Sequence, residues 1–149
     1  MLLRAVPAHD LPRLTDLWVE SWASLELDID FEARRAWLPE HLQSLVAGGA
    51  ALIGVYAPEL AGFVTINPAT GWLDQICVAP QHFGSGAALA LMNEAKRLAH
   101  HRVELDVVEA NPRAIRFYQR EGFKTIGFGV SPRSGLKTRL MRWERQLPG

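Results

Sequence analysis

The chain has 149 residues, enough for one domain with a hydrophobic core of its own. Sixteen basic and 16 acidic residues give zero net charge, so bulk electrostatics draws the protein neither to nucleic acid nor to an anionic membrane. One cysteine excludes an intrachain disulfide, and no run approaches the roughly 18 apolar residues of a membrane span. The N-terminus lacks a signal-peptide pattern, so we expect a cytoplasmic protein without nucleic-acid or membrane partners.

Apolar spacing, turn residues and helix caps predict a single domain over residues 1–149. The first half is expected to contain a strand at 2–6, a helix from 11 capped by Asp10, a short helix at 31–37 capped by Asp30, and a helix from Pro39 to 46. Three strands follow at 50–57, 60–67 and 72–78, and then a helix after Gly86. The last elements are a strand at 103–108, a helix from Asn111 to 121, and strands at 123–130 and 136–145. The order β-α-α-β-β-β-α-β-α-β-β predicts an α/β fold. Its central mixed sheet has about seven strands, with helices on both faces.

The stretch at residues 72–100 passes from an apolar strand through Gly84-Ser85-Gly86 into a long helix. The first N–H groups of a helix have no partner inside it and carry partial positive charge, so they bind anions. Glycine lets a phosphate approach these amides because it has no Cβ. A Walker loop is excluded because no Lys follows either glycine, and a dinucleotide fingerprint because Leu89 stands where its third glycine belongs. We therefore expect a different kind of phosphate-bearing ligand.

Two motifs narrow the choice of ligand. They are Val78-x-Pro80-x-x-x-Gly84-x-Gly86-x-Ala88 and Asn111-x-x-Ala114-x-x-Phe117-Tyr118-x-x-x-Gly122-Phe123. Present together, in this order and a strand apart, they resemble the GCN5-related N-acetyltransferases (GNAT). The resemblance covers residues 60–130. It implies a GNAT-like fold with acetyl-coenzyme A as co-substrate, its pyrophosphate bound at the glycine loop.

The resemblance also implies roles for individual residues. In the family, the strand before the loop splays from its neighbour, so its backbone faces the pantetheine arm and the N–H of Val78 polarises the thioester carbonyl. Tyr118 protonates the leaving thiolate, and Asn111 hydrogen-bonds the pantetheine chain. The implied coenzyme contacts are Ile76, Cys77, Val78, Phe83, Gly84, Ser85, Gly86, Ala87, Ala88, Asn111, Ala114, Phe117 and Tyr118.

One residue departs from the family pattern. Counted from Val78 and Pro80, the loop position that usually holds Gln or Arg is occupied by Phe83. An alternative register, Gln81-x-x-Gly84-x-Gly86, supplies a polar side chain but no longer aligns Pro80. The backbone amides of the loop can supply most of the anion binding, while the lost side chain predicts weaker coenzyme affinity.

Asp74 is the candidate general base, because many relatives place Glu or Asp four residues before Val78. Its short side chain implies a water relay, and the same position also suits a solvated charge at a strand edge. Three other acidic residues in the expected acceptor wall compete for the role. They are Glu20, Asp28 and Asp30.

The acceptor site is expected to involve residues of the first helices and of the last loop. Trp18, Trp22 and Trp37 suit either the core or an apolar, cation-binding pocket. Glu20 and Arg133 are further candidate acceptor contacts. Cys77 is expected to be a small core residue, and the five histidines show no metal-ligand spacing, so no metal is expected.

The predicted activity is transfer of an acetyl group from acetyl-coenzyme A to a primary amine, directly, in a ternary complex. Two alternatives stay open. One is a non-catalytic module that senses acyl-coenzyme A, suggested by Phe83 and by the short Asp74. The other is an acetyltransferase for a protein N-terminus or lysine. The acceptor is a small-molecule or peptide amine, and the protein is a monomer or a homodimer.

Overall fold

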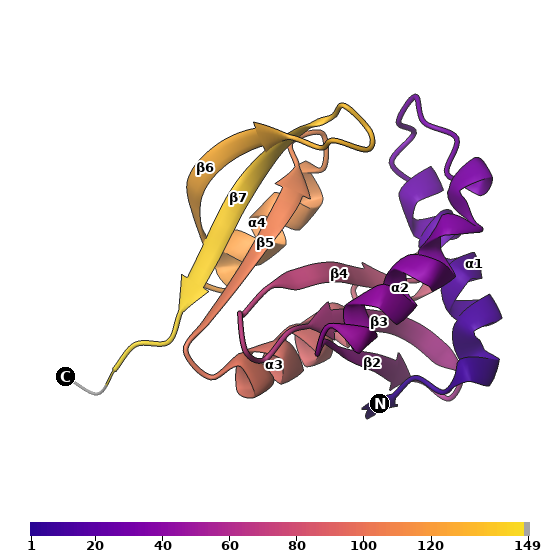
Figure 1. Cartoon of the computed structure of the whole chain (residues 1–149), viewed down its shortest axis with the longest axis horizontal. Helices are drawn as coiled ribbons and strands as arrows, with labels where there is room; N and C mark the ends of the chain where they lie inside the picture. Colours follow the sequence, from indigo (N-terminus) through magenta and orange to yellow (C-terminus); the bar gives the residue numbers. More distant parts are fainter. Residues whose placement is uncertain (148–149) are drawn as a thin grey trace.

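The computed structural model describes residues 1–147, which form seven strands and four α-helices (Figure 1). The strands are divided between two sheets, and each sheet is antiparallel throughout. Where the sequence predicted one mixed sheet, the structure has two halves that meet at a parallel bridge between Trp72 and Glu104. The division leaves a gap in the middle of the fold.

The first sheet contains β1 (Leu2–Ala5), β2 (Ala51–Tyr56), β3 (Leu60–Ile66) and β4 (Leu73–Val78), in that spatial order. Every residue of β3 is buried, because helices pack against both faces of this strand. Val64 belongs to one hydrophobic cluster and Phe63 to the other, on opposite faces of the sheet.

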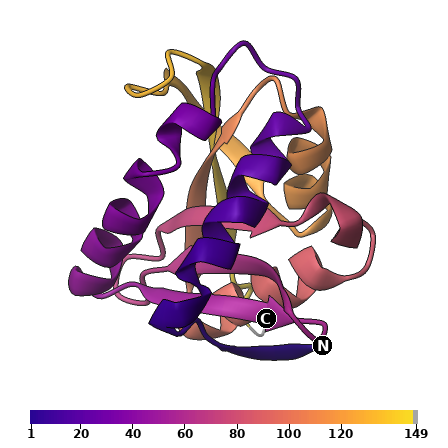
Figure 2. The same cartoon turned by 90° about the vertical axis from the view of Figure 1, so that its right-hand side faces the viewer.

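Two helices, α1 (Leu11–Ala23) and α2 (Trp37–Ala47), cover one face of the first sheet, and α3 (Ala87–Ala99) covers the other. Figure 2 shows α1 crossing in front of the strands. Three short 3₁₀ turns, η1 (Ala8–Asp10), η2 (Glu32–Arg34) and η3 (Pro80–His82), lie in the connections. The helix expected at residues 31–37 is reduced to η2, with Asp30 Oδ1 accepting the N–H of Ala33 at 3.1 Å.

Asp10 precedes α1 as predicted, but its side chain does not cap the helix. The carboxylate instead accepts a hydrogen bond from the Tyr56 hydroxyl, with Oδ2 and the phenolic oxygen 2.7 Å apart. The carboxylate that would cap the helix is therefore hydrogen-bonded to Tyr56 of β2. The predicted cap is therefore correct in position and wrong in mechanism.

The second sheet contains β5 (Arg102–Val108), β7 (Lys137–Glu144) and β6 (Lys124–Val130), with β7 in the middle. The fourth helix, α4 (Pro112–Arg120), packs on it through Ile115 and Tyr118, which join Leu105 and Met141 in the hydrophobic core. The same core includes residues of α3, so α3 and α4 cover the same side of the molecule.

Strands β4 and β5 diverge from the Trp72–Glu104 bridge (Figure 1). Next to the bridge, the Glu104 N–H donates to the Gly71 carbonyl at 2.9 Å. Gly71 has a φ of +78°, and a Cβ at this position would collide with the carbonyl oxygen of Arg102. Only glycine permits this close approach, so residue 71 fixes the point from which the two sheets separate.

Candidate active site

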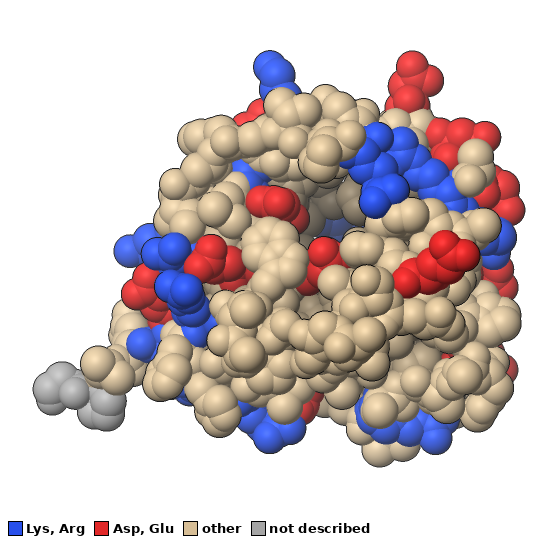
Figure 3. Space-filling view, in the orientation of Figure 1, with Lys and Arg blue, Asp and Glu red and all other residues tan. Residues whose placement is uncertain are grey.

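A cavity of about 570 Å³ opens between the two sheets where β4 and β5 separate. Its volume is in the range of small-molecule sites. Figure 3 shows a hollow on this face, with acidic atoms on its left and lower rim and basic atoms on its right. The lining residues are Trp18, Trp22, Phe31, Arg34, Trp37, His41, Leu73, Asp74, Gln75, Ile76, Leu105, Asp106, Val107, Val108, Asn111, Ala114, Tyr118, Val130, Ser131, Pro132, Arg133, Ser134, Leu136 and Thr138.

The backbone of β4 presents hydrogen-bonding groups to the gap. The N–H of Ala79 donates to the Ala61 carbonyl at 2.8 Å, so Ala79 and Cys77 direct their backbone groups toward β3. Successive residues of an antiparallel strand alternate in this respect. The N–H and C=O groups of Ile76 and Val78 therefore point away from β3, toward β5. This orientation makes the Val78 N–H available to a carbonyl oxygen of a ligand.

Four of the 13 predicted coenzyme contacts line the cavity, namely Ile76, Asn111, Ala114 and Tyr118, and four of the others place their side chains in or against the core. The Cys77 thiol is buried on the α1 side, 3.9 Å from the Leu17 carbonyl oxygen, and burial raises its pKa to about 12. A thiol of this kind is a core group and not a nucleophile. Ala87 is a core residue, and Ala88 and Phe117 pack against the same core.

The loop before α3 has the backbone form expected of an anion site. Gly84 and Gly86 have φ values of +77° and +90°, and Gly86 is the N-cap of α3. The hydroxyl of Ser85 accepts the N–H of Ala87 at 3.3 Å. A Cβ added at Gly84 would meet no atom within 4 Å, so the space beside this glycine is open.

Phe83 is 38% exposed at the edge of this loop. The guanidinium of Arg113 lies over its ring, with Cζ 4.0 Å from the ring centroid. Arg113 belongs to the first turn of α4, so the second motif brings a positive charge to the loop of the first. The sequence analysis missed this residue, because nothing in the spacing of the two motifs indicates which positions touch.

Helix α4 starts at the predicted cap. Asn111 Oδ1 accepts the N–H of Ala114 at 3.2 Å, which confirms the N-cap. Tyr118 follows two turns later, 7% exposed, with its ring against Phe117 and Phe123 at centroid distances of 5.6 and 5.7 Å. Burial raises the pKa of Tyr118 above its ordinary value of about 10, so the phenol remains a proton donor at neutral pH.

Asp74 lies at the centre of a polar network in the cavity wall. Its Oδ2 is 2.6 Å from His41 Nε2 and accepts from Gln75 Nε2 at 3.3 Å, while Oδ1 accepts from Trp72 Nε1 at 3.3 Å. Trp18 Nε1 in turn donates to Gln75 Oε1 at 3.3 Å. The network fixes the carboxylate and leaves it beside an imidazole. The Asp74 carboxylate is thus hydrogen-bonded within the protein, and it is not mainly solvated as a charge at a strand edge would be.

His41 is the partner of Asp74 in this network, and the sequence analysis did not single it out. It comes from α2, its ring stacks on Trp37 at a centroid distance of 4.3 Å, and its side chain is 24% exposed. With Nε2 directed at Asp74, the imidazole retains Nδ1, which forms no hydrogen bond within residues 1–147. The pair is separated by 33 positions in the sequence, so local spacing cannot reveal it.

Aromatic side chains form the wall opposite the strands. Trp18, Trp22 and Trp37 all line the cavity, together with Phe31 from the connection between α1 and α2. Trp22 stacks on Phe31 at a centroid distance of 5.0 Å, and Trp18 meets Phe31 edge-on at 5.9 Å. The predicted contact Arg133 lies in the loop between β6 and β7, with its Cζ 3.9 Å from the Trp37 ring centroid.

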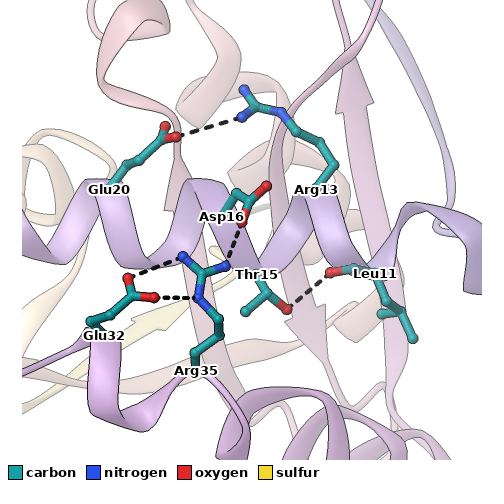
Figure 4. A network of polar contacts seen from close by, with 7 residues as sticks. All are labelled: Leu11, Arg13, Thr15, Asp16, Glu20, Glu32 and Arg35. Carbon is teal, nitrogen blue, oxygen red and sulfur yellow. Dashed lines mark hydrogen bonds and ion pairs between the residues drawn. The ribbon is translucent and has the colours of Figure 1, made fainter.

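The three acidic residues that competed with Asp74 lie outside the cavity lining. Figure 4 shows Glu20 directed along the surface of α1 toward Arg13, with Oε1 and Nη1 3.8 Å apart. In the same view, Arg35 pairs with Asp16 and Glu32 and ties η2 to α1. These ion pairs hold residues 31–34, which include the lining residues Phe31 and Arg34, against α1. Glu20, which the sequence analysis expected at the acceptor site, therefore lies outside the cavity lining.

Comparison with known proteins settles the family. The family model described as "Acetyltransferase (GNAT) family" matches residues 11–123. The chain belongs to the GNAT acetyltransferase family. It is thus an N-acetyltransferase that uses acetyl-coenzyme A, as the paired motifs predicted.

Individual GNAT proteins resemble the chain over nearly its whole length. It is 28% identical over 142 residues to the peptidyl-lysine N-acetyltransferase YiaC of Escherichia coli strain K12, covering 95% of this chain and 96% of that protein. A GCN5-related N-acetyltransferase from Rhodopseudomonas palustris superposes with a TM-score of 0.81 at 15% identity, covering 97% and 95% of the two chains. The PaiA N-acetyltransferase of Thermoplasma acidophilum, solved in complex with coenzyme A, gives a TM-score of 0.80 at 19% identity, covering 97% and 98%.

Residues 1–147 contain no group of three or more His, Cys, Asp or Glu side chains arranged to hold a metal ion. Within the same residues, no helix has the length and hydropathy of a membrane span.

Proposed function

We propose that the enzyme moves an acetyl group from acetyl-coenzyme A to a primary amine by direct transfer, with both substrates bound in the gap between β4 and β5. The observation that carries this proposal is the free backbone edge of β4 at Ile76 and Val78, because Ile76 lines the same cavity as Tyr118 and Asp74. A donor thioester at this edge and an amine in the aromatic part of the cavity would meet beside both side chains.

The coenzyme is proposed to run from the glycine loop to the cavity. Its pyrophosphate binds the amides at the start of α3, where Gly84 and Gly86 leave room, and Arg113 adds a cation at the same place. The pantetheine arm then follows the open edge of β4. Asn111 lines the cavity on this path. Its Oδ1 caps α4, so its Nδ2 remains available to donate a hydrogen bond to the arm.

Three groups are proposed to carry the proton and charge changes. The amine nitrogen attacks the thioester carbonyl carbon, and the Val78 N–H stabilises the oxyanion while the N–C bond forms. The amine proton passes to His41 Nδ1, with Asp74 holding the imidazole through Nε2. The C–S bond breaks, and the thiolate takes the proton of Tyr118, which solvent then restores.

The test begins with calorimetry of acetyl-coenzyme A binding and continues with thiol release in the presence of a broad panel of amines. Binding followed by amine-dependent thiol release supports the proposal. No binding of acetyl-coenzyme A or of a longer acyl-coenzyme A at millimolar concentration refutes it. Binding without transfer to any amine would identify an acyl-coenzyme A sensor instead.

A second candidate acceptor is a lysine side chain of a protein. It is favoured by the resemblance to the Escherichia coli protein that is named a peptidyl-lysine N-acetyltransferase. Incubation with a blocked lysine peptide and mass spectrometry of the product distinguishes this acceptor from free small amines.

A further inference from the structure

The cavity carries opposite charges on its two sides. Asp74 and Asp106 line it from β4 and β5, whereas Arg34 and Arg133 line it from η2 and from the loop after β6. In Figure 3, acidic atoms lie to the left of the hollow and below it, and basic atoms lie to its right. The transfer chemistry accounts for Asp74 alone among these four residues.

The two guanidinium groups have no carboxylate partner within residues 1–147. Arg133 lies over the Trp37 ring, and Arg34 approaches the Phe31 ring with Cζ 5.9 Å from its centroid. Arg34 Nη2 also reaches the Arg133 carbonyl oxygen at 3.5 Å, so the two residues are neighbours. Two adjacent cations against aromatic faces leave most of their N–H donors free for an anion.

On the acidic side, the carboxylate of Asp106 likewise has no partner among residues 1–147. Asp106 forms no hydrogen bond or ion pair with any other residue in the described range 1–147. Partial burial, with a smaller contribution from the nearby charge of Asp74, raises the pKa of Asp106. An ammonium group placed between Asp74 and Asp106 would supply the positive charge that Asp106 does not receive from the protein.

Contacts across the aromatic wall connect the two sides. Arg133 lies on Trp37, Trp37 stacks on His41, and His41 is hydrogen-bonded to Asp74. The cationic and anionic groups are therefore separated by two stacked rings within one cavity. A molecule with an amine at one end, a carboxylate at the other and an apolar body between them would match this sequence of groups.

We propose that the acceptor is a free amino acid in which an apolar chain or ring separates the primary amine from the carboxylate, bound by its carboxylate at Arg34 and Arg133 and by its amine at Asp74 and Asp106. The proposal rests on the amine acetyltransfer proposed above and names the chemical class of its acceptor. The carboxylate would receive charge-assisted hydrogen bonds from two planar guanidiniums. The tryptophans and Phe31 would contact the apolar body.

Matched acceptor pairs test the requirement for the carboxylate. The pairs are para-aminomethylbenzoate with benzylamine, aminobutanoate with propylamine, and aminohexanoate with pentylamine, and a blocked lysine peptide represents a protein acceptor. We expect kcat/KM to be about tenfold to a hundredfold higher for the carboxylate-bearing member of at least one pair, as for loss of a charged hydrogen bond. Equal kcat/KM within every pair would overturn the proposal, as would exclusive use of the lysine peptide.

Arginine variants test the position of the carboxylate. Arg133→Gln and Arg34→Gln should raise KM for the amino acid about tenfold more than KM for the paired amine, and Arg133→Lys should restore part of the loss. Arg97→Gln, on the exposed side of α3, is the matched control. Unchanged discrimination within the pairs in both glutamine variants would refute the assignment. Failure of all amines and of coenzyme binding would instead refute the proposed transfer activity.

Discussion

Replacing Asp74 by Asn tests the proposed proton acceptor most directly. Asn has nearly the same shape, but one of its two terminal groups becomes an N–H₂ donor, and the site around Asp74 consists of donors. In either orientation the amide lacks the negative charge that stabilises an imidazolium, and with its nitrogen facing His41 it also requires Nε2 to accept, which moves the imidazole proton to Nδ1. His41 then has no lone pair for the amine proton. The substitution therefore disables the base without removing it.

The expected loss of turnover follows from the proposed role of Asp74, which is to hold His41 as the general base. Loss of a positioned general base lowers turnover by about 10²- to 10⁴-fold, equivalent to roughly 3 to 5 kcal/mol of transition-state free energy. Stability should change much less, because the Asp74 side chain is 22% exposed and its partners can rebind water. Coenzyme affinity should stay the same, since the network lies on the acceptor side of the cavity.

The assay is a double-mutant cycle with Asp74→Asn, His41→Gln and the double variant, in which kcat is measured with one amine at saturating acetyl-coenzyme A. If the two residues act as one unit, the double variant has about the same kcat as the less active of the two single variants. Glu94→Gln, which removes a carboxylate of α3 that pairs with Arg97 and lies outside the cavity lining, is the control. Additive losses, or a kcat of Asp74→Asn within threefold of the parent enzyme, would refute the reasoning.

Three further results are expected. Tyr118→Phe should lower kcat about a hundredfold with unchanged coenzyme affinity by calorimetry, because the ring contacts with Phe117 and Phe123 remain; an unchanged kcat removes Tyr118 from the acid role. Arg113→Gln should raise the Kd for acetyl-coenzyme A about tenfold, and less so at high salt, whereas Arg120→Gln on the same helix should not. The raised pKa of Cys77 stabilises the folded protein below the ordinary thiol pKa, and this contribution is lost as pH rises toward about 12. Iodoacetamide at pH 8 should therefore label the thiol in urea but not in the native protein; equal labelling would contradict the burial.

The parts of the site that the sequence could predict are those in which the chemistry is local. Asn111 as a helix cap, and glycines at the start of α3, follow from neighbouring residues and from the hydrogen bonds that a helix end requires. Asp10 shows the limit of the same argument, because a hydroxyl from a distant strand competes for its carboxylate.

The parts that could not be predicted depend on contacts between distant segments. His41 meets Asp74, and Arg113 meets Phe83, only after α2 and α4 have docked, and neither pair has a characteristic spacing. The acceptor wall behaves in the same way: tryptophan spacing on α1 is equally compatible with a core and with a cavity. Which of the two occurs depends on how far β5 stands from β4.

That separation depends on Gly71, which is remote from every reacting group. Because a side chain here would strike the Arg102 carbonyl, any substitution has to push the second sheet outward from its junction with the first. A small displacement at the vertex grows along the diverging strands and changes the width of the acceptor cavity without altering its lining. Selection or engineering at residue 71 and its neighbours could thus shift which acceptors fit, while all of the chemical groups stay in place.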